Sequence, residues 1–132
     1  MSELKYLEID EVYAIHVRMI KIGGGRGGVR DFLLLHSAIE RPKASFGGKM
    51  LYPTLWIQAA AMLHSLVKNH PFTDGNKRTG FFSTIRFLKI NGYKLKAKQK
   101  DVVKFSIAVD NENLSLEYMA SWLKKHSKKM QS

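Results

Sequence analysis

Several side chains that could take part in catalysis or ligand binding lie within nine consecutive residues of this 132-residue chain, HPFTDGNKR at positions 70–78. His70 is the side chain in this run whose ordinary pKa suits it to accept a proton near neutral pH. Asp74 is the only carboxylate of the run, and one carboxylate together with phosphate oxygens is the usual way in which Mg²⁺ is held. The run therefore combines a candidate general base with a candidate metal ligand.

The second half of the run has the features of an anion site. Asn76 is expected to begin a helix whose first N–H groups lack intrahelical partners, and Gly75 lets a ligand approach the main chain closely. Lys77 and Arg78 lie in the first helical turn, where cations oppose the helix dipole unless a bound polyphosphate supplies negative charge. Phe72 is expected to point inward and fix the loop. The plainer alternative, a common D-G-N turn before a basic helix start, explains each residue singly but not all of them together.

The elements that must position this run are predicted from apolar spacing, which is helical almost everywhere. We expect helices over about 10–21, 31–40, 54–69, 76–90, 101–109 and 115–125. Asp10 and Ser115 are expected as N-caps, and the glycine run at 23–28 should stop the first helix. The stretch over 54–69 is apolar nearly all round, which predicts a central, buried helix.

One segment is expected to be strand-like. Residues 44–52 place a Gly-Gly turn between short apolar pieces, which predicts a small β-hairpin or flap and is the only strand-like element we expect. The predicted fold class is therefore all-α, a compact helical bundle with one hairpin flap. It is expected to form a single domain over residues 1–132, with the motif loop at 70–78.

Composition excludes several classes of protein. The chain is 45% hydrophobic and has no cysteine, which excludes wholesale disorder, disulfides and Cys-ligated zinc. No apolar run approaches the roughly 20 residues of a membrane helix, and no secretory signal is recognisable, so we expect a soluble, cytoplasmic protein. Lys and Arg number 22 against 11 Asp and Glu, a net charge of +11. Charge alone therefore makes nucleic acid the first candidate partner.

The motif makes nucleic acid a less favoured candidate than charge alone suggests. Residues 70–78 match the Fic/Doc signature H-P-F-x-D/E-G-N-G/K-R at every defined position. The chain resembles the death-on-curing (Doc) branch of that family from about Tyr6 to His126. Further matches are Gly24-Gly25, Gly28 to Asp31, Arg41-Pro42, Ala44 to Gly48, Leu51 to Pro53 and Asn91 to Tyr93. Leu33 and His36 depart from the usual Doc pattern outside the motif. The fold implied is the compact Fic/Doc-type helical bundle.

The resemblance implies a nucleotide-dependent transferase that acts on a protein hydroxyl, with ATP and Mg²⁺ as cofactors. By this resemblance His70 would be the base that deprotonates a target Ser, Thr or Tyr. Asp74 would bind Mg²⁺, and Phe72 would be the buried anchor of the loop.

The same resemblance implies how the nucleotide is held. Gly75 and Asn76 would form the anion hole, and Arg78 would bind the ATP phosphates. Lys77 stands where adenylyltransferases of the family usually have glycine, whereas Doc proteins have lysine. This favours transfer of the γ-phosphate, a kinase reaction, over the alternative of AMP transfer, although the chemistry of the motif is compatible with both.

Partners also follow from the resemblance. The expected target is a threonine of elongation factor Tu, whose modification halts translation, and the flap at 44–52 would hold the target as an added strand. The family's inhibitory motif, S/T-x-x-x-E/D-G/N, is not clear at either terminus, which implies a separate Phd-type antitoxin. The chain would then be the toxin of a type II toxin–antitoxin system, with no membrane partner.

Other polar residues have plainer interpretations. His64 precedes His70 by six residues, a spacing that does not suit a helical zinc pair, so His64 is expected to be a core or supporting histidine. His16, between Ile15 and Val17 on the first predicted helix, is expected to be structural. Arg30 and Asp31 are expected to form a helix cap and an ion pair. The lysines at 94–100, expected in a loop, and those of a basic tail at 124–129 are a solvated surface, an antitoxin-docking surface or a weak RNA contact. A basic nucleic-acid-binding module is the third functional hypothesis, and nucleic acid is not expected as a direct ligand.

Overall fold

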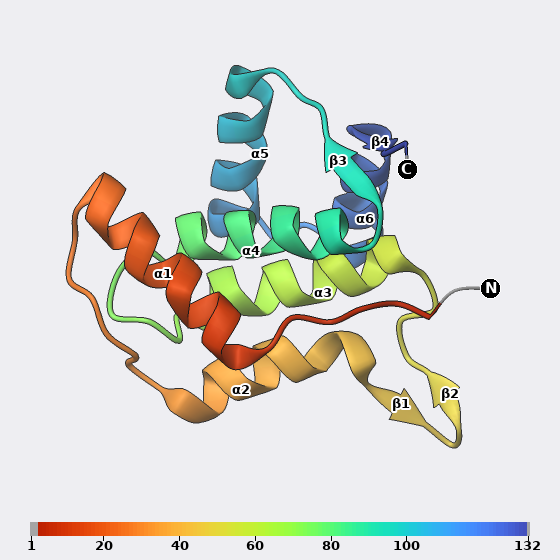
Figure 1. Cartoon of the computed structure of the whole chain (residues 1–132), viewed down its shortest axis with the longest axis horizontal. Helices are drawn as coiled ribbons and strands as arrows, with labels where there is room; N and C mark the ends of the chain where they lie inside the picture. The colour runs from red at the N-terminus through yellow and green to blue at the C-terminus, as the bar shows by residue number, and fades with distance from the viewer. Residues whose placement is uncertain (1–2, 132) are drawn as a thin grey trace.

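The computed structural model describes residues 3–131 of the chain. Helices α3 (Leu55–Lys68) and α4 (Asn76–Ile90) run side by side through the centre of the molecule. In Figure 1, α1 (Ile9–Gly23) and α2 (Phe32–Glu40) lie on one side of this pair, and α5 (Gln99–Asn111) and α6 (Leu116–Lys125) lie on the other. The described residues are therefore mainly helical, as predicted for a Fic/Doc-type bundle.

Helix α3 is the core element, and its sequence explains why. Thr54 caps it by accepting a hydrogen bond from the Ile57 N–H at 3.2 Å. Nine of its 14 residues are buried, and its three successive alanines, Ala59 to Ala61, are fully buried. Such small side chains let neighbouring helices approach closely. The predicted central, buried helix is therefore confirmed.

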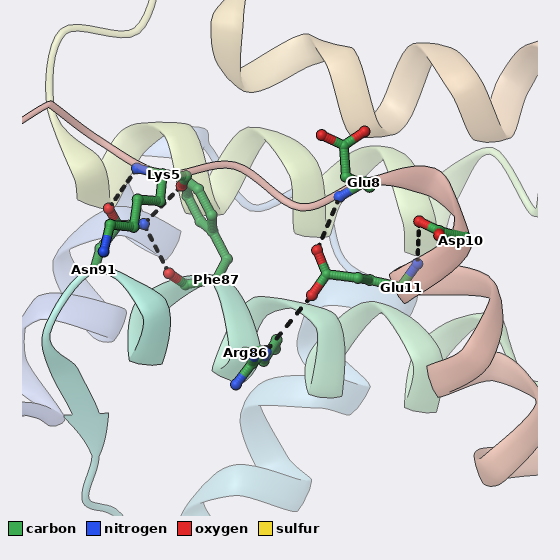
Figure 2. A network of polar contacts seen from close by, with 7 residues as sticks. All are labelled: Lys5, Glu8, Asp10, Glu11, Arg86, Phe87 and Asn91. Carbon is green, nitrogen blue, oxygen red and sulfur yellow. Dashed lines mark hydrogen bonds and ion pairs between the residues drawn. The ribbon is translucent and has the colours of Figure 1, made fainter.

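Helix α1 is fastened antiparallel to α4 at the end remote from the motif loop (Figure 2). The Asn91 side chain accepts from the Lys5 N–H at 2.8 Å and donates to the Lys5 carbonyl at 2.9 Å. The Glu11 carboxylate receives the Glu8 N–H and lies 3.8 Å from Arg86 Nε of α4. The helix thus begins after Glu8, two residues before the expected cap Asp10, because Glu11 can reach back to the Glu8 N–H.

The predicted flap is present as the antiparallel pair β1 (Ser45–Phe46) and β2 (Lys49–Met50). It follows one turn of 3₁₀ helix at Arg41–Lys43. Arg41 fixes the base of the flap by donating to Tyr52 Oη at 3.0 Å and to the Ala61 carbonyl of α3 at 3.1 Å. The hairpin itself is exposed, and Phe46 is 82% exposed.

The prediction of a single strand-like element is wrong, because the structure has a second pair of antiparallel strands. Strand β3 (Tyr93–Leu95) pairs antiparallel with β4 (Ser127–Lys129), in the register Tyr93↔Lys129, Lys94↔Lys128 and Leu95↔Ser127. The lysines at 94 and 128 therefore lie in strands and not in a loop and a tail. The strands are short and separated by two helices, so no turn signal joins them in the sequence.

The remaining helices follow the prediction with small shifts. Helix α5 starts at Gln99, two residues before the expected start, and α6 has the expected cap, with Ser115 accepting the Tyr118 N–H at 3.0 Å. The first helix ends at Gly23. None of the helices within residues 3–131 has the length and apolar character needed to cross a bilayer.

Candidate active site

The motif loop joins the end of α3 to the start of α4, and the Asn76 side chain closes it. Asn76 is 8% exposed; its Oδ1 accepts the Phe72 N–H at 2.9 Å and its Nδ2 donates to the Phe72 carbonyl at 3.0 Å. Gly75 precedes the helix with φ 76°, in the left-handed region that favours glycine. Since the Asn76 amide is used within the loop, the donors that remain for an anion are the backbone N–H groups of the first turn of α4.

Phe72 points inward, as expected, and is fully buried. Its ring stacks on the imidazole of His16 from α1, with centroids 3.9 Å apart and planes 7° from parallel. His16 Nδ1 lies 3.2 Å from Thr79 Oγ1 of α4, and His16 Nε2 has no hydrogen-bond partner. Burial, and secondly the charge of Arg78, lowers the pKa of His16 below its usual 6.5, so this ring is held neutral beneath the loop.

The glycine run is the outer wall of the loop. Thr73 N–H donates to the Gly28 carbonyl at 3.0 Å, and Val29 forms an isolated antiparallel bridge with Phe72. A Cβ on Gly25, whose φ is 108°, would stand 3.2 Å from the Asp74 Cβ. The glycines of this run therefore let its main chain lie close to the motif loop.

Arg30 is a positioning residue that sequence reasoning missed. Its Nε donates to the His70 carbonyl at 2.7 Å and its Nη2 to the Asn69 carbonyl at 2.9 Å. His70 has φ 48°, an uncommon conformation for a residue with a side chain, which the surroundings must hold in place. Asp31 caps α2 through the Leu34 N–H, as expected, but the expected Arg30–Asp31 ion pair is not among the ion pairs of the described residues.

The predicted site residues meet at one hollow of about 320 Å³. It is lined by His70, Thr73, Asp74, Gly75, Asn76, Lys77 and Arg78 of the motif, with Val67 and Asp110. His70 and Asp74 are exposed at its surface. Phe72 does not reach the hollow, because it is buried beneath the loop.

The carboxylate of Asp74 fits as one ligand of a Mg²⁺–nucleotide complex. Its Oδ2 accepts the Arg26 N–H at 2.8 Å, which orients the carboxylate. Within residues 3–131, no three His, Asp or Glu side chains gather as a metal site. A Mg²⁺ ion held by Asp74 would therefore take its other ligands from phosphate oxygens and water, the arrangement that this ion prefers.

The two cations of the motif are oriented differently. Arg78 turns toward α1, where Nη1 donates to the Met19 carbonyl at 2.7 Å and Nη2 to the Gly24 carbonyl at 2.8 Å. Lys77 Nζ lies 3.8 Å from Asp110 Oδ2 of α5. Asp110 lies 33 residues beyond Lys77 and was missed, since no sequence pattern signals its approach.

His64 is partly buried outside this hollow. Arg41 Nη1 lies 3.3 Å from its Nδ1, and burial, followed by the charges of Arg41 and Lys68, lowers the pKa of His64. This placement fits the expected structural role of His64 near the base of the flap.

The chain is similar to a known protein family and to a curated protein. The model of the Fic/DOC family matches residues 6–88. A curated relative, "Toxin Doc" of Mycolicibacterium smegmatis (strain ATCC 700084 / mc(2)155), is 50% identical over 74 residues, which cover 56% of this chain and 57% of that protein. The match thus spans little more than half of the relative's length.

Proposed function

The chain belongs to the Fic/DOC family, in its Doc branch, and from this premise we propose that it is the toxin of a type II toxin–antitoxin system. Its activity in this proposal is transfer of the γ-phosphate of ATP to a protein hydroxyl. One observation carries the proposal: His70, Asp74 and the first turn of α4 line the same hollow.

In this reaction His70 accepts the proton of the target hydroxyl. The hydroxyl oxygen then forms a bond to the γ-phosphorus while the bond from that phosphorus to the bridging β–γ oxygen breaks, and ADP leaves with that oxygen. Arg30, by holding the His70 carbonyl, keeps the imidazole at the edge of the hollow. Such positioning accounts for most of what phosphoryl transfer needs from a protein.

The phosphates would lie at the start of α4. The N–H groups of the first turn and the helix dipole attract anions there, and Gly75 leaves room for close approach. Arg78 has five N–H donors, of which its two bonds to α1 leave others for a phosphate oxygen. Mg²⁺, held by Asp74, would neutralise phosphate charge when bound.

Lys77 supports γ-phosphate transfer over AMP transfer. Its side chain, with Asp110, occupies part of the hollow that a glycine at this position would leave open. We therefore expect the γ-phosphate, not the α-phosphate, to face His70.

The proposed target is a threonine of elongation factor Tu, bound along the flap. The flap is a two-stranded hairpin with free edges, and Arg41 anchors its base while Phe46 is exposed. An extended peptide could add to such an edge by main-chain hydrogen bonds. We further propose a Phd-type antitoxin as partner and a cytoplasmic location.

The test is incubation of the purified protein with elongation factor Tu, Mg²⁺ and ATP labelled at either the γ or the α position. We expect label from the γ position on the target, and a rate about 10²–10⁴-fold lower for His70→Ala. His36→Ala, which removes an exposed histidine of α2 that does not line the hollow, is the matched control and should keep the rate. Label from the α position alone would replace the kinase by an adenylyltransferase, and no label from either would overturn both.

A further inference from the structure

The positive charge of the chain is concentrated at one end of the molecule. Residues 94–104 and 124–129 contain nine lysines and one acidic residue, Asp101. The lysines, all exposed, are Lys94, Lys96, Lys98, Lys100, Lys104, Lys124, Lys125, Lys128 and Lys129. None of them forms an ion pair within residues 3–131. Most of the net charge of +11 therefore lies here without an internal partner.

The β3–β4 pairing aligns some of these lysines on one face. Lys94 and Lys128 are directly opposite in the register, and side chains at opposed positions project to the same side. Lys96 follows Lys94 by two residues and shares this side. Tyr93 and Leu95 take the other side and pack against the core. Like charges placed directly opposite destabilise a hairpin, so this lysine face is built at a cost to the fold.

A groove with aromatic walls adjoins the lysine face. It has a volume of about 690 Å³ and lies between α5 and α6. Its lining includes Lys100, Lys104, Tyr118, Trp122 and His126. Trp122 is stacked between Phe105, at 3.9 Å, and His126, at 4.0 Å, so both faces of its ring are covered. Tyr118, which is 55% exposed, is the aromatic residue of the lining that a ligand can reach. The groove and the lysine face are neighbours, because His126, which lines the groove, accepts the Lys96 N–H through its carbonyl.

We propose that the lysine face and the α5–α6 groove together bind a single-stranded nucleic acid. Lysine ammonium groups suit a run of phosphates, and the exposed ring of Tyr118 can accept an unstacked base, which a duplex does not offer. A protein partner fits less well, because protein–protein interfaces are depleted in lysine, the residue that dominates this surface. The expectation that nucleic acid is not a direct ligand rested on the motif, and the motif does not involve these lysines.

This surface is separate from the active site and independent of the proposed transfer reaction. Helix α4 has the motif at its first residue and leads into β3 at its last, so the two regions lie at opposite ends of a 15-residue helix. The α5–α6 groove and the hollow share no lining residue, although Glu112 of the groove is only two residues beyond Asp110 of the hollow. Lys100, at the other end of α5, is separated from Asp110 by about 15 Å of helix. A strand on the lysine face would therefore leave the hollow beside His70 open.

The test measures binding of a fluorescent 20-nucleotide oligouridylate by anisotropy at several salt concentrations. We expect salt-sensitive binding that Lys94→Glu/Lys128→Glu weakens at least tenfold, with a salt slope smaller by about 1.4, as the loss of two phosphate contacts to a single strand requires. Arg18→Glu/Lys21→Glu changes the net charge equally at exposed sites of α1, away from β3 and from the α5–α6 groove, and should alter affinity less than threefold.

The aromatic groove has its own readout. Tyr118→Ala should weaken oligouridylate binding about fivefold or more, because the exposed ring is lost, whereas Tyr118→Phe should keep most of the affinity. Binding of oligothymidylate in the same way would support the same chemistry. No binding at low salt, equal loss in the control pair, tighter binding of duplex, or binding of polyglutamate alone would each overturn the proposal. His70→Ala should leave binding unchanged.

Discussion

The motif loop and the lysine face use their cations in opposite ways. At the motif loop, Arg78 and Arg30 donate to main-chain carbonyls of α1 and of the loop itself. At the lysine face, Lys94 and Lys128 stand opposite each other in the solvent without an internal partner. A planar guanidinium with several donors can fix two segments at once, whereas an ammonium is a well-hydrated point charge. The cations of the motif loop therefore hold the main chain in a fixed conformation, whereas those of the lysine face remain exposed to solvent.

This contrast predicts where substitutions affect folding. Side chains of the motif loop should contribute strongly to stability as well as to activity. Side chains of the lysine face should contribute little to stability, or reduce it. The free energy of unfolding of variants in the two regions measures this difference.

Phe72→Ala should have the largest effect. The fully buried ring stacks on His16 and supports the loop, so its removal should lower the free energy of unfolding by about 3–5 kcal/mol. Urea denaturation followed by circular dichroism measures this loss. Phe82→Ala is the control, because Phe82 is 47% exposed on α4 and should cost far less. Equal losses would mean that the loop has no special dependence on its anchor.

Asn76→Ala should have the next largest effect. It leaves the buried N–H and carbonyl of Phe72 without their partners, which should cost about 2–4 kcal/mol in the same denaturation experiment. The exposed Asn113 provides a matched change, Asn113→Ala, which should lie within about 0.5 kcal/mol of the parent. A small loss for Asn76→Ala would show that the loop is held mainly by Arg30 and the glycine run.

Lowering the pH should reduce the free energy of unfolding through His16, the histidine beneath the motif loop. The pKa of His16 is lowered by burial in the folded chain, so the unfolded chain binds its proton more readily below about pH 6.5. The contribution of neutral His16 to the free energy of unfolding is therefore complete above about pH 6.5, and it is lost as the pH falls toward the lowered pKa of the folded state. The lowered pKa of His64 acts in the same direction. Unfolding free energies between pH 7 and 5 should decline less steeply in His16→Gln than in the parent, and an unchanged slope would exclude His16 as a cause.

What could be read from the sequence differs between the two regions. The loop from His70 to Arg78 was predicted residue by residue, because its components are contiguous and its helix start has local signals. The roles of Arg30 and Asp110 could not be predicted, since both reach the site through tertiary packing over at least 30 residues of sequence. The β3–β4 pairing was missed for the same reason: Leu95 and Ser127 meet only after α5 and α6 have folded between them.

The smallest expected effect is of opposite sign and tests the lysine face directly. Lys128→Glu replaces a like-charge pair with Lys94 by an attractive one, so it should raise the free energy of unfolding by about 0.2–1 kcal/mol. Lys124→Glu is the control: it makes the same charge change in the last turn of α6, where a cation suits the helix dipole, and should destabilise slightly. If Lys128→Glu stabilises the fold and weakens oligouridylate binding together, the lysine serves a ligand rather than the fold. Loss of stability on Lys128→Glu would mean that the lysine face, like the motif loop, uses its charge to hold the structure.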